Sequence, residues 1–100
     1  MPFQNCAGLM FKDSAIRREA PASSGVYGLS NARGWVYVGE TDNIQVRLFE
    51  HLDGKRKLPA DRCPTGFNFE ICAAHDRLAR QRRLIQELRP SCNDAVPERI

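Results

Sequence analysis

The fold of this chain is decided by residues 25–39, which read GVYGLSNARGWVYVG. Aromatic and β-branched residues fill a short segment on each side of Asn-Ala-Arg-Gly at 31–34, and that tetrapeptide is typical of a turn. The pattern therefore predicts a β-hairpin. Each strand carries one tyrosine close to a glycine, as Gly25-Val26-Tyr27 in the first strand and Tyr37-Val38-Gly39 in the second.

The length of the turn decides on which face of the hairpin each tyrosine lies. Side chains alternate between the two faces of a strand, so a four-residue loop would separate Tyr27 from Tyr37. A three-residue loop that ends on a left-handed glycine with a bulge pairs Asn31 with Trp35 instead. Leu29 then pairs with Tyr37, and Tyr27 becomes a diagonal neighbour on the same face. We therefore predict that both phenols lie together. They are either half of an active site or ordinary aromatic residues of a strand.

The remaining periodicity gives the element order β-β-α-β-α. Asp42 is a candidate N-cap for the helix after the hairpin, with Gln45 in the capping-box position. The expected elements are a short helix over 14–19, strands over 25–30 and 35–40, a helix over 43–52, a strand over 67–71 and a helix over 75–88. We predict an α+β fold with a small three-stranded, mainly antiparallel sheet flanked by helices.

Length and composition indicate one domain without a membrane segment. The chain has 100 residues, of which 42% are hydrophobic and 27% are charged, as is usual for globular proteins. No apolar run approaches the ~18 residues that span a membrane, and the N-terminus has no secretory pattern. We expect a cytoplasmic protein with a lead-in over 1–22, a domain over 23–93 and a tail over 94–100.

The cysteines argue against a zinc centre. They form no CxxC pair, and the two histidines do not complete a set of ligands. We expect free, mostly buried thiols at Cys6, Cys63, Cys72 and Cys92.

The basic residues are clustered, although the formal net charge is only +3. Such clusters suit the phosphate backbone of a nucleic acid, and a solvated helix face with a polar loop explains them equally well. The candidate nucleic-acid-binding residues are Lys55, Arg56, Lys57, Arg77, Arg80 and Arg83.

Both long helices place polar side chains beside an apolar stripe. In the first, Arg47 and His51 lie at the edge of the stripe and Glu50 points away from them. The stripe of the second helix contains Ala74, Leu78, Gln81, Ile85 and Leu88. A buried amide in the middle of this stripe needs a hydrogen-bond partner. We expect that partner to be Tyr27, Tyr37, Arg47, His51 or a bound ligand.

These residues together resemble the GIY-YIG nucleases, over about residues 23–93. The two tyrosine–glycine patterns are similar to the elements that name the family, and Arg47 and His51 follow at the spacing of its helix. The segment 83–93 resembles the closing pattern of the family, an apolar pair followed by proline and asparagine. Family members cleave DNA phosphodiesters with one divalent metal and include homing endonucleases, restriction enzymes, resolvases and the incision subunit of nucleotide-excision repair.

The resemblance implies a role for each matching residue. Tyr27 would orient or deprotonate the attacking water with the support of Tyr37. Arg47 would stabilise charge on the phosphorus, and His51 would assist proton transfer or hold the phosphate. A Mg²⁺ or Mn²⁺ ion would polarise the phosphate. The structural residues near the site would be Gly25, Gly39 and Asn93, the last of which would fasten the tail.

One position departs from the pattern of the family. Its metal ligand is a glutamate three residues before the apolar pair Leu84-Ile85, and that position here is Gln81. Mg²⁺ prefers carboxylate oxygen, and a neutral amide binds it more weakly. Glu40, at the end of the second strand, is the second candidate ligand. Gln81 is either the natural residue of a domain with little or no metal-dependent cleavage, or an engineered replacement of glutamate by the isosteric glutamine.

Three functions are open on this evidence. The first is a GIY-YIG-type DNA endonuclease, or a catalytically weakened relative of one, that acts on branched, damaged or specific duplex DNA. Such a protein could be a monomer that recognises DNA shape, a homodimer or a subunit of a larger complex. The second is a non-catalytic nucleic-acid-binding module that uses the same cleft, and the third is a protein-interaction domain. A steep loss of binding with salt supports either DNA function, and metal-dependent cleavage separates the first from the second.

Overall fold

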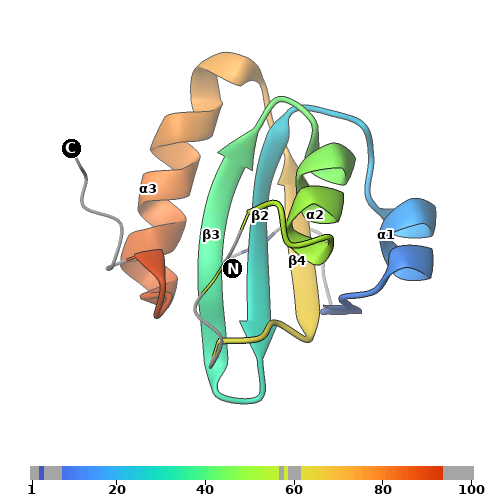
Figure 1. The fold of residues 1–100 in the computed structure, drawn as a ribbon. Coiled ribbons are helices and arrows are strands. Elements are labelled where there is room, and N and C mark those ends of the chain that lie inside the picture. The colour runs from blue at the N-terminus through green and yellow to red at the C-terminus, as the bar shows by residue number, and fades with distance from the viewer. Residues whose placement is uncertain (1–2, 4–7, 57, 59–61, 94–100) are drawn as a thin grey trace.

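The computed structural model describes residues 3, 8–56, 58 and 62–93. Its elements are β1 Leu9–Met10, α1 Asp13–Glu19, β2 Gly25–Asn31, β3 Gly34–Thr41, α2 Ile44–Leu52, β4 Gly66–Ile71, a 3₁₀ turn over Ala74–Asp76 and α3 Arg77–Leu88. An antiparallel sheet of order β1-β4-β2-β3 forms the middle layer, with α1 and α2 on one face and α3 on the other (Figure 1). No helix among these residues is long and apolar enough to cross a membrane.

The predicted α+β class and antiparallel sheet are confirmed, and the sheet has a fourth strand that the sequence did not indicate. The short β1 pairs with β4 through Leu9 and Phe67. Two residues are too few to show an alternating pattern, which is why this strand was not expected. The helix predicted over 14–19 is α1, and its Ile16 is fully buried in the core. The predicted tail over 94–100 lies outside the described residues.

The hairpin has the predicted Leu29–Tyr37 pair but a different turn. Ser30, not Asn31, pairs with Trp35, and the register shift leaves Val36 as the extra residue. The turn is tighter than expected because the Asn31 side chain accepts a hydrogen bond from the Arg33 backbone N–H at 2.8 Å. The bulge therefore lies within β3 rather than at the glycine, and it still brings both tyrosines to one face.

The N-cap of α2 lies one residue later than predicted. Asn43, not Asp42, is the N-cap, and its side chain accepts from the Val46 backbone N–H at 3.0 Å. Gln45 does not complete a capping box, because its amide donates to the Ala20 carbonyl at 3.2 Å. That bond fastens α2 to the end of α1.

Each face of the sheet carries its own core. On the α1–α2 face, Ile16, Leu48 and Phe67 are among the fully buried residues. On the α3 face, Leu84 packs against Val26, Val38 and Phe3. The predicted stripe of α3 is therefore wrong in detail, because Leu84 is the residue of α3 that is buried and Leu78 is 51% exposed.

The outer edge of β3 is covered by the segment that follows α3. Arg89 takes a left-handed conformation with φ 50°, and the chain then turns back along the strand. The backbone N–H groups of Ser91 and Cys92 donate to β3 carbonyls at 3.1 and 2.8 Å. Asn93 bonds to the Val38 peptide in both directions, accepting from its N–H at 2.7 Å and donating to its carbonyl at 2.9 Å. Unpaired groups of an edge strand are satisfied in this way.

Replacing Asn93 by alanine should destabilise the fold by removing both bonds to the buried Val38. We expect the free energy of unfolding to fall by about 1–3 kcal/mol, measured by urea denaturation. Ser91→Ala is the matched control, because its hydroxyl makes a weak contact with the Cys92 sulfur at 3.9 Å. That variant should stay within about 0.5 kcal/mol of the parent. Equal stability of the two variants would contradict this role of Asn93.

Candidate functional site

Three rings meet on the α2 face of the hairpin. The centroids of Tyr27 and Tyr37 are 6.1 Å apart, and each lies 5.5 Å from that of His51. The Tyr27 hydroxyl is within 2.8 Å of His51 Nε2, a hydrogen-bond distance. Tyr27 is buried and Tyr37 is half-buried against the core, so one phenol is fixed inside the fold and the other is partly accessible. The prediction that the tyrosines lie together is confirmed.

Two glycines allow this arrangement by leaving space for close approach. A Cβ on Gly39 would lie 2.5 Å from the Tyr27 hydroxyl oxygen, so the phenol lies directly over the bare backbone of β3. A Cβ on Gly25 would lie 2.2 Å from the Glu70 carbonyl oxygen of the neighbouring strand. Any side chain at these positions would push β4 or the ring aside.

Burial keeps the Tyr27–His51 pair uncharged. Desolvation raises the pKa of Tyr27 well above its usual value, with Tyr37 adding to the shift and the charge of Arg47 opposing it. Desolvation also lowers the pKa of His51 to about 4, although the nearby Arg56 backbone partly opposes that shift. The second ring nitrogen, Nδ1, is buried and has no partner of hydrogen-bond geometry among the described residues. At neutral pH the pair is therefore a phenol and a neutral imidazole.

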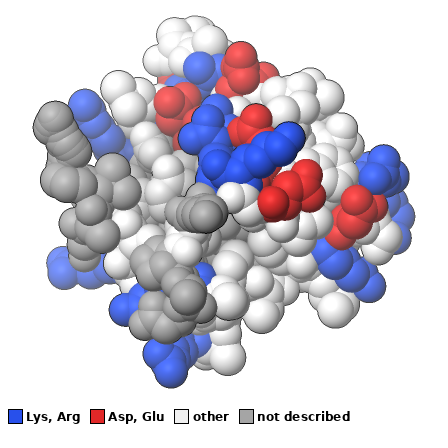
Figure 2. All heavy atoms as spheres, in the orientation of Figure 1, with Lys and Arg blue, Asp and Glu red and all other residues white. Residues whose placement is uncertain are grey.

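Two arginines share one carboxylate at the rim of the site. Glu50 Oε1 lies 3.2 Å from Arg47 Nε and 2.8 Å from Arg56 Nε. The expectation that Glu50 points away from Arg47 is wrong, and the i,i+3 spacing of the two residues could have indicated the pair. The Arg56 hydrogen bond lowers the pKa of Glu50, which stays ionised. Figure 2 shows acidic and basic atoms side by side over the region of α2.

The two candidate metal ligands are both engaged in other bonds. Gln81 donates its amide to the Val38 carbonyl at 3.3 Å, so its partner is the edge of β3 and not one of the residues predicted for it. Because α3 covers the opposite face, Gln81 reaches this edge from the side away from α2. Glu40 accepts from Arg77 Nε at 2.8 Å.

The candidate ligands among the described residues do not fit a Mg²⁺ ion. Within the described part of the chain, no group of three or more His, Cys, Asp or Glu side chains could hold a metal. The thiols of Cys72 and Cys92 are free, and Cys63 is exposed rather than buried as expected. The amide of Gln81 is neutral, and the carboxylate of Glu40 already neutralises an arginine.

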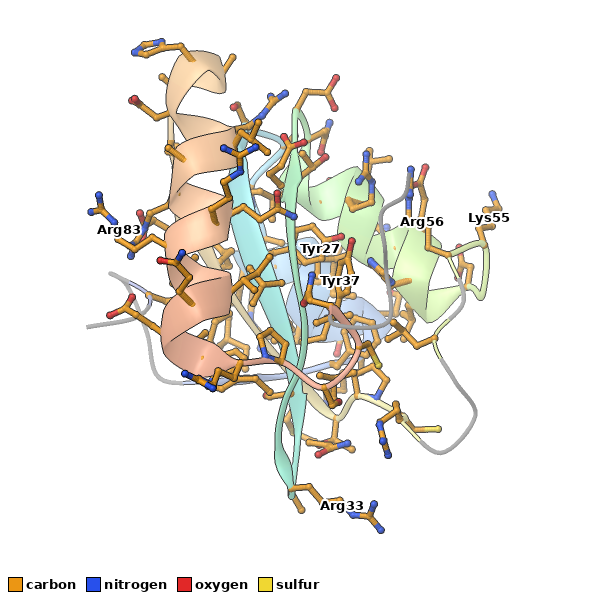
Figure 3. The ribbon with its side chains drawn as sticks, turned by 90° about the vertical axis from the view of Figure 1, so that its left-hand side faces the viewer. Tyr27, Arg33, Tyr37, Lys55, Arg56 and Arg83 are labelled. Carbon is orange, nitrogen blue, oxygen red and sulfur yellow. The ribbon has the colours of Figure 1, made fainter. Side chains whose placement is uncertain are left out.

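The predicted nucleic-acid-binding residues do not form one surface. Lys55 and Arg56 lie at the end of α2 near the tyrosines, whereas Arg83 points away from them on the far side of α3 (Figure 3). Arg77 and Arg80 are held in ion pairs with Glu40 and Glu70, at 2.8 and 2.9 Å. Lys57 lies outside the described residues.

Comparison with solved structures identifies the fold. The magnesium-bound GIY-YIG N-terminal endonuclease domain of UvrC from Thermotoga maritima has a TM-score of 0.62 and 19% identity, over 80% of this chain and 97% of that one. An asparagine-to-alanine point mutant of that domain, bound to its catalytic divalent cation, gives 0.62 and 19%, over 80% and 96%. A tyrosine-to-phenylalanine point mutant gives 0.62 and 18%, over 80% and 97%.

Comparison at the level of sequence gives no match, either to a protein-family model or to a curated protein. The structural likeness shows that this chain has the GIY-YIG fold, which confirms the predicted fold. The likeness therefore lies in the arrangement of the helices and strands, since only 19% of the aligned residues are identical.

Acid should destabilise the fold through His51. Its pKa of about 4 lies below the usual 6.5, so between these values the unfolded chain binds more protons. The contribution of His51 is fully present above pH 6.5 and is lost as the pH falls toward 4. Urea denaturation should show the free energy of unfolding decreasing across this window, by less than ~1.4 kcal/mol per pH unit because the ring is partly exposed.

Two histidine variants separate this effect from general acid denaturation. His51→Gln should flatten the profile between pH 6.5 and 4. His75→Gln changes an exposed histidine of the 3₁₀ turn before α3 and is the matched control, in which the profile of the parent should persist. A His51→Gln profile as steep as that of the parent would show that another group titrates.

Proposed function

We propose that this chain is a nuclease-type domain that binds the phosphate backbone of DNA and has little or no metal-dependent cleavage activity. The observation that carries this proposal is the contrast between the two sides of β3. On the α2 side, Tyr27, Tyr37 and His51 meet beside Arg47. On the α3 side, the position expected for a metal ligand is Gln81, whose amide is bonded to the strand. The GIY-YIG fold, seen in a domain described as an endonuclease, supports the nuclease type.

The two arginines of the site are suited to a phosphate. Their guanidinium groups already share one carboxylate oxygen, that of Glu50, at 3.2 and 2.8 Å. A phosphate offers the same kind of charged acceptor oxygens and can replace this carboxylate. In the free protein, Glu50 keeps both guanidinium groups ordered beside the tyrosines. On binding, Arg47 and Arg56 turn from Glu50 to the DNA backbone.

The half-buried Tyr37 offers its hydroxyl to the same phosphate site. Tyr27 is buried, keeps its proton at neutral pH because its pKa is raised, and shares a hydrogen bond with His51 Nε2. Proton transfer from a water to Tyr27 would require Tyr27 to pass its own proton to His51 Nε2, 2.8 Å away. The low pKa of His51 makes it a weak base, which disfavours this transfer and supports a binding role for the site.

The missing carboxylate limits cleavage. Hydrolysis of a phosphodiester by members of this fold type needs a divalent cation, and the described residues supply a neutral amide where a carboxylate is expected. Gln81 therefore acts as a structural residue that joins α3 to β3. Its replacement by glutamate would remove the donor to the Val38 carbonyl and place a carboxylate at the edge of β3.

A nicking assay tests the loss of metal-dependent activity. Labelled branched and plain duplex DNA are incubated with Mg²⁺ or Mn²⁺ and with the parent or its Gln81→Glu variant. We expect the parent to nick little and Gln81→Glu to nick about tenfold faster or more, because a carboxylate gives the cation a ligand. Gln86→Glu is the matched control, since Gln86 is an exposed residue of the same helix, and it should gain nothing.

Two further variants test the other side of β3. Adding Tyr27→Phe to Gln81→Glu should abolish the gained activity. In the parent, Arg47→Ala should weaken DNA binding and reduce the salt dependence of the binding constant by about one phosphate contact. A parent as active as Gln81→Glu would contradict the loss of cleavage. A parent that fails to bind DNA at low salt would overturn the proposed function and favour a protein-interaction domain.

A further inference from the structure

The side of α3 that faces solvent is strongly basic. Leu84 points into the core and Gln81 reaches the edge of β3, so the helix turns its opposite side outward. That outward side carries three exposed arginines, two in the middle of the helix and one at its C-cap, with uncharged residues between them. We call this surface the basic face, and its exposed residues are Ala79, Arg82, Arg83, Gln86 and Arg89.

The arginines of the basic face differ from the other arginines of the same helix in having no acidic partner. Arg77 and Arg80 form ion pairs with carboxylates of β3 and β4, at 2.8 and 2.9 Å. Within the described residues, none of the three arginines of the basic face forms an ion pair or a side-chain hydrogen bond. Glu87 is the one acidic residue of α3, and although it lies one turn from Arg83 the two form no ion pair.

The stability of the helix does not account for all of these charges. The helix dipole favours a cation at the C-terminal end, which explains Arg89. Arg82 and Arg83 lie before the last turn of α3, where the effect of the dipole has fallen off. Adjacent like charges repel each other, so a ligand that carries negative charge gains from both of them.

The arrangement of the basic face favours an extended phosphate backbone over a small anion or a protein. Arg82 and Arg89 lie two turns apart on one side of the helix, roughly 10 Å along its axis, and guanidinium groups in a row suit the successive charges of a backbone. The pocket beside this face has a volume of about 180 Å³ and includes Asp76 in its lining, which disfavours a free anion. Ala79 and Gln86 provide no large apolar side chain of the kind that anchors a protein interface.

The basic face lies on the other side of the sheet from the tyrosines. α2 packs on one face of the sheet and α3 on the other (Figure 1). Figure 3 shows Arg83 directed away from Tyr27 and Tyr37, beyond α3. Because the sheet and α3 itself lie between the two surfaces, a straight duplex against the α2 site does not reach the basic face.

We propose that the basic face binds the phosphate backbone of a second DNA segment while the α2 site holds the first. This inference rests on the proposed function, since it takes the α2 site as the first DNA contact. It assigns a substrate class to the domain, namely DNA in which two duplex segments meet at one protein, as they do at a branch. Branched DNA is bound more tightly than a plain duplex, because binding of one arm raises the effective concentration of the other.

A bridging assay tests the second contact directly. A short duplex is immobilised, the protein is added at low salt, and retention of a second, fluorescent duplex is measured. The parent should retain the fluorescent duplex, and a variant with both Arg82→Ala and Arg83→Ala should retain about tenfold less, since each arginine contributes about one phosphate contact. For branched DNA, that variant should lower the slope of log K against log salt by about 0.9 for each arginine. Its affinity for a single duplex should stay within about twofold of the parent, because the α2 site is unchanged.

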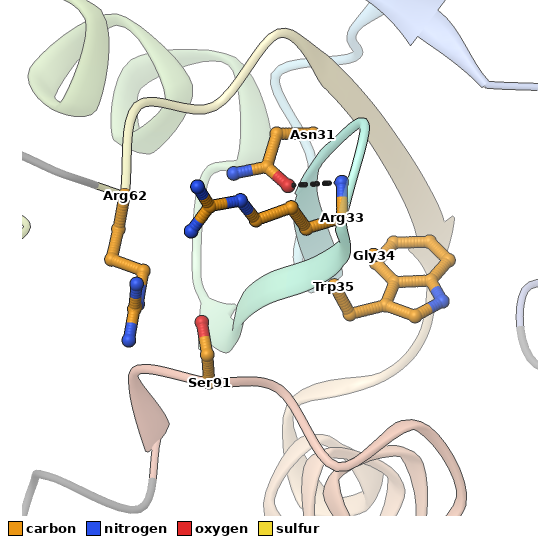
Figure 4. A pocket seen from close by; sticks show the side chains of 6 residues that line it. All are labelled: Asn31, Arg33, Gly34, Trp35, Arg62 and Ser91. Carbon is orange, nitrogen blue, oxygen red and sulfur yellow. Dashed lines mark hydrogen bonds between the residues drawn. The ribbon is translucent and has the colours of Figure 1, made fainter.

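Arg33→Ala is the matched control, because it removes an exposed arginine that belongs to neither surface. Arg33 lies at the tip of the hairpin, where it lines a pocket of about 250 Å³ together with Trp35 and Ser91 (Figure 4). Figure 3 shows its side chain far from that of Arg83. The turn keeps its shape in this variant, because Asn31 accepts a hydrogen bond from the backbone N–H of residue 33. Retention of the fluorescent duplex should match that of the parent.

The outcomes separate this inference from the proposed function. If the parent binds one duplex through Arg47 but retains no second duplex, the basic face is not a DNA site, while the proposed function stands. If Arg33→Ala lowers retention as much as the double variant of α3, the loss is a general effect of charge and the inference is wrong. If fluorescent polyglutamate is retained and a second duplex is not, the face fits an acidic protein, which also overturns the inference. A parent that binds no DNA at low salt would overturn both proposals.

Discussion

The structure depends on how the outward peptide group of Val38 is satisfied. β3 is the last strand of the sheet, so its outer N–H and C=O need partners from outside the sheet. Asn93 bonds to both, and Gln81 donates a further hydrogen bond to the carbonyl. These contacts fix α3 and the segment after it to the strand that carries Tyr37. The edge is covered, and the site beside it is held in place by the same bonds.

Desolvation then sets the chemistry of the two sides of this strand. On the α2 face it disfavours charge on both members of the Tyr27–His51 pair, which leaves a neutral donor and a neutral acceptor. Glu50 forms ion pairs with the two arginines nearby. Such a site favours a ligand that brings its own negative charge. The α3 face offers an amide at the strand edge, which has no comparable attraction for a dication.

Local patterns predicted much of the fold and of the α2 site. The hairpin, the shared face of Tyr27 and Tyr37, and the helix with Arg47 and His51 follow from alternation, turn chemistry and helical spacing, which act over a few residues. The errors in these elements are features assigned to the wrong residue close by in the sequence. Asn43 caps α2 in place of Asp42, and the bulge lies at Val36 rather than at the turn. Adjacent residues of similar chemistry compete for such roles, and packing decides between them.

Apart from the two-residue strand β1, the sequence by itself determined the elements, their order and the residues that gather at the α2 face, because these depend on short-range periodicity. Only the tertiary structure decided that α3 covers the opposite face, that Gln81 bonds to Val38, and that Arg62, the hairpin turn and Ser91 meet around Arg33. These contacts join residues far apart in the chain, some more than forty positions. Their partners depend on sheet order and on the burial of each face, which no local pattern contains.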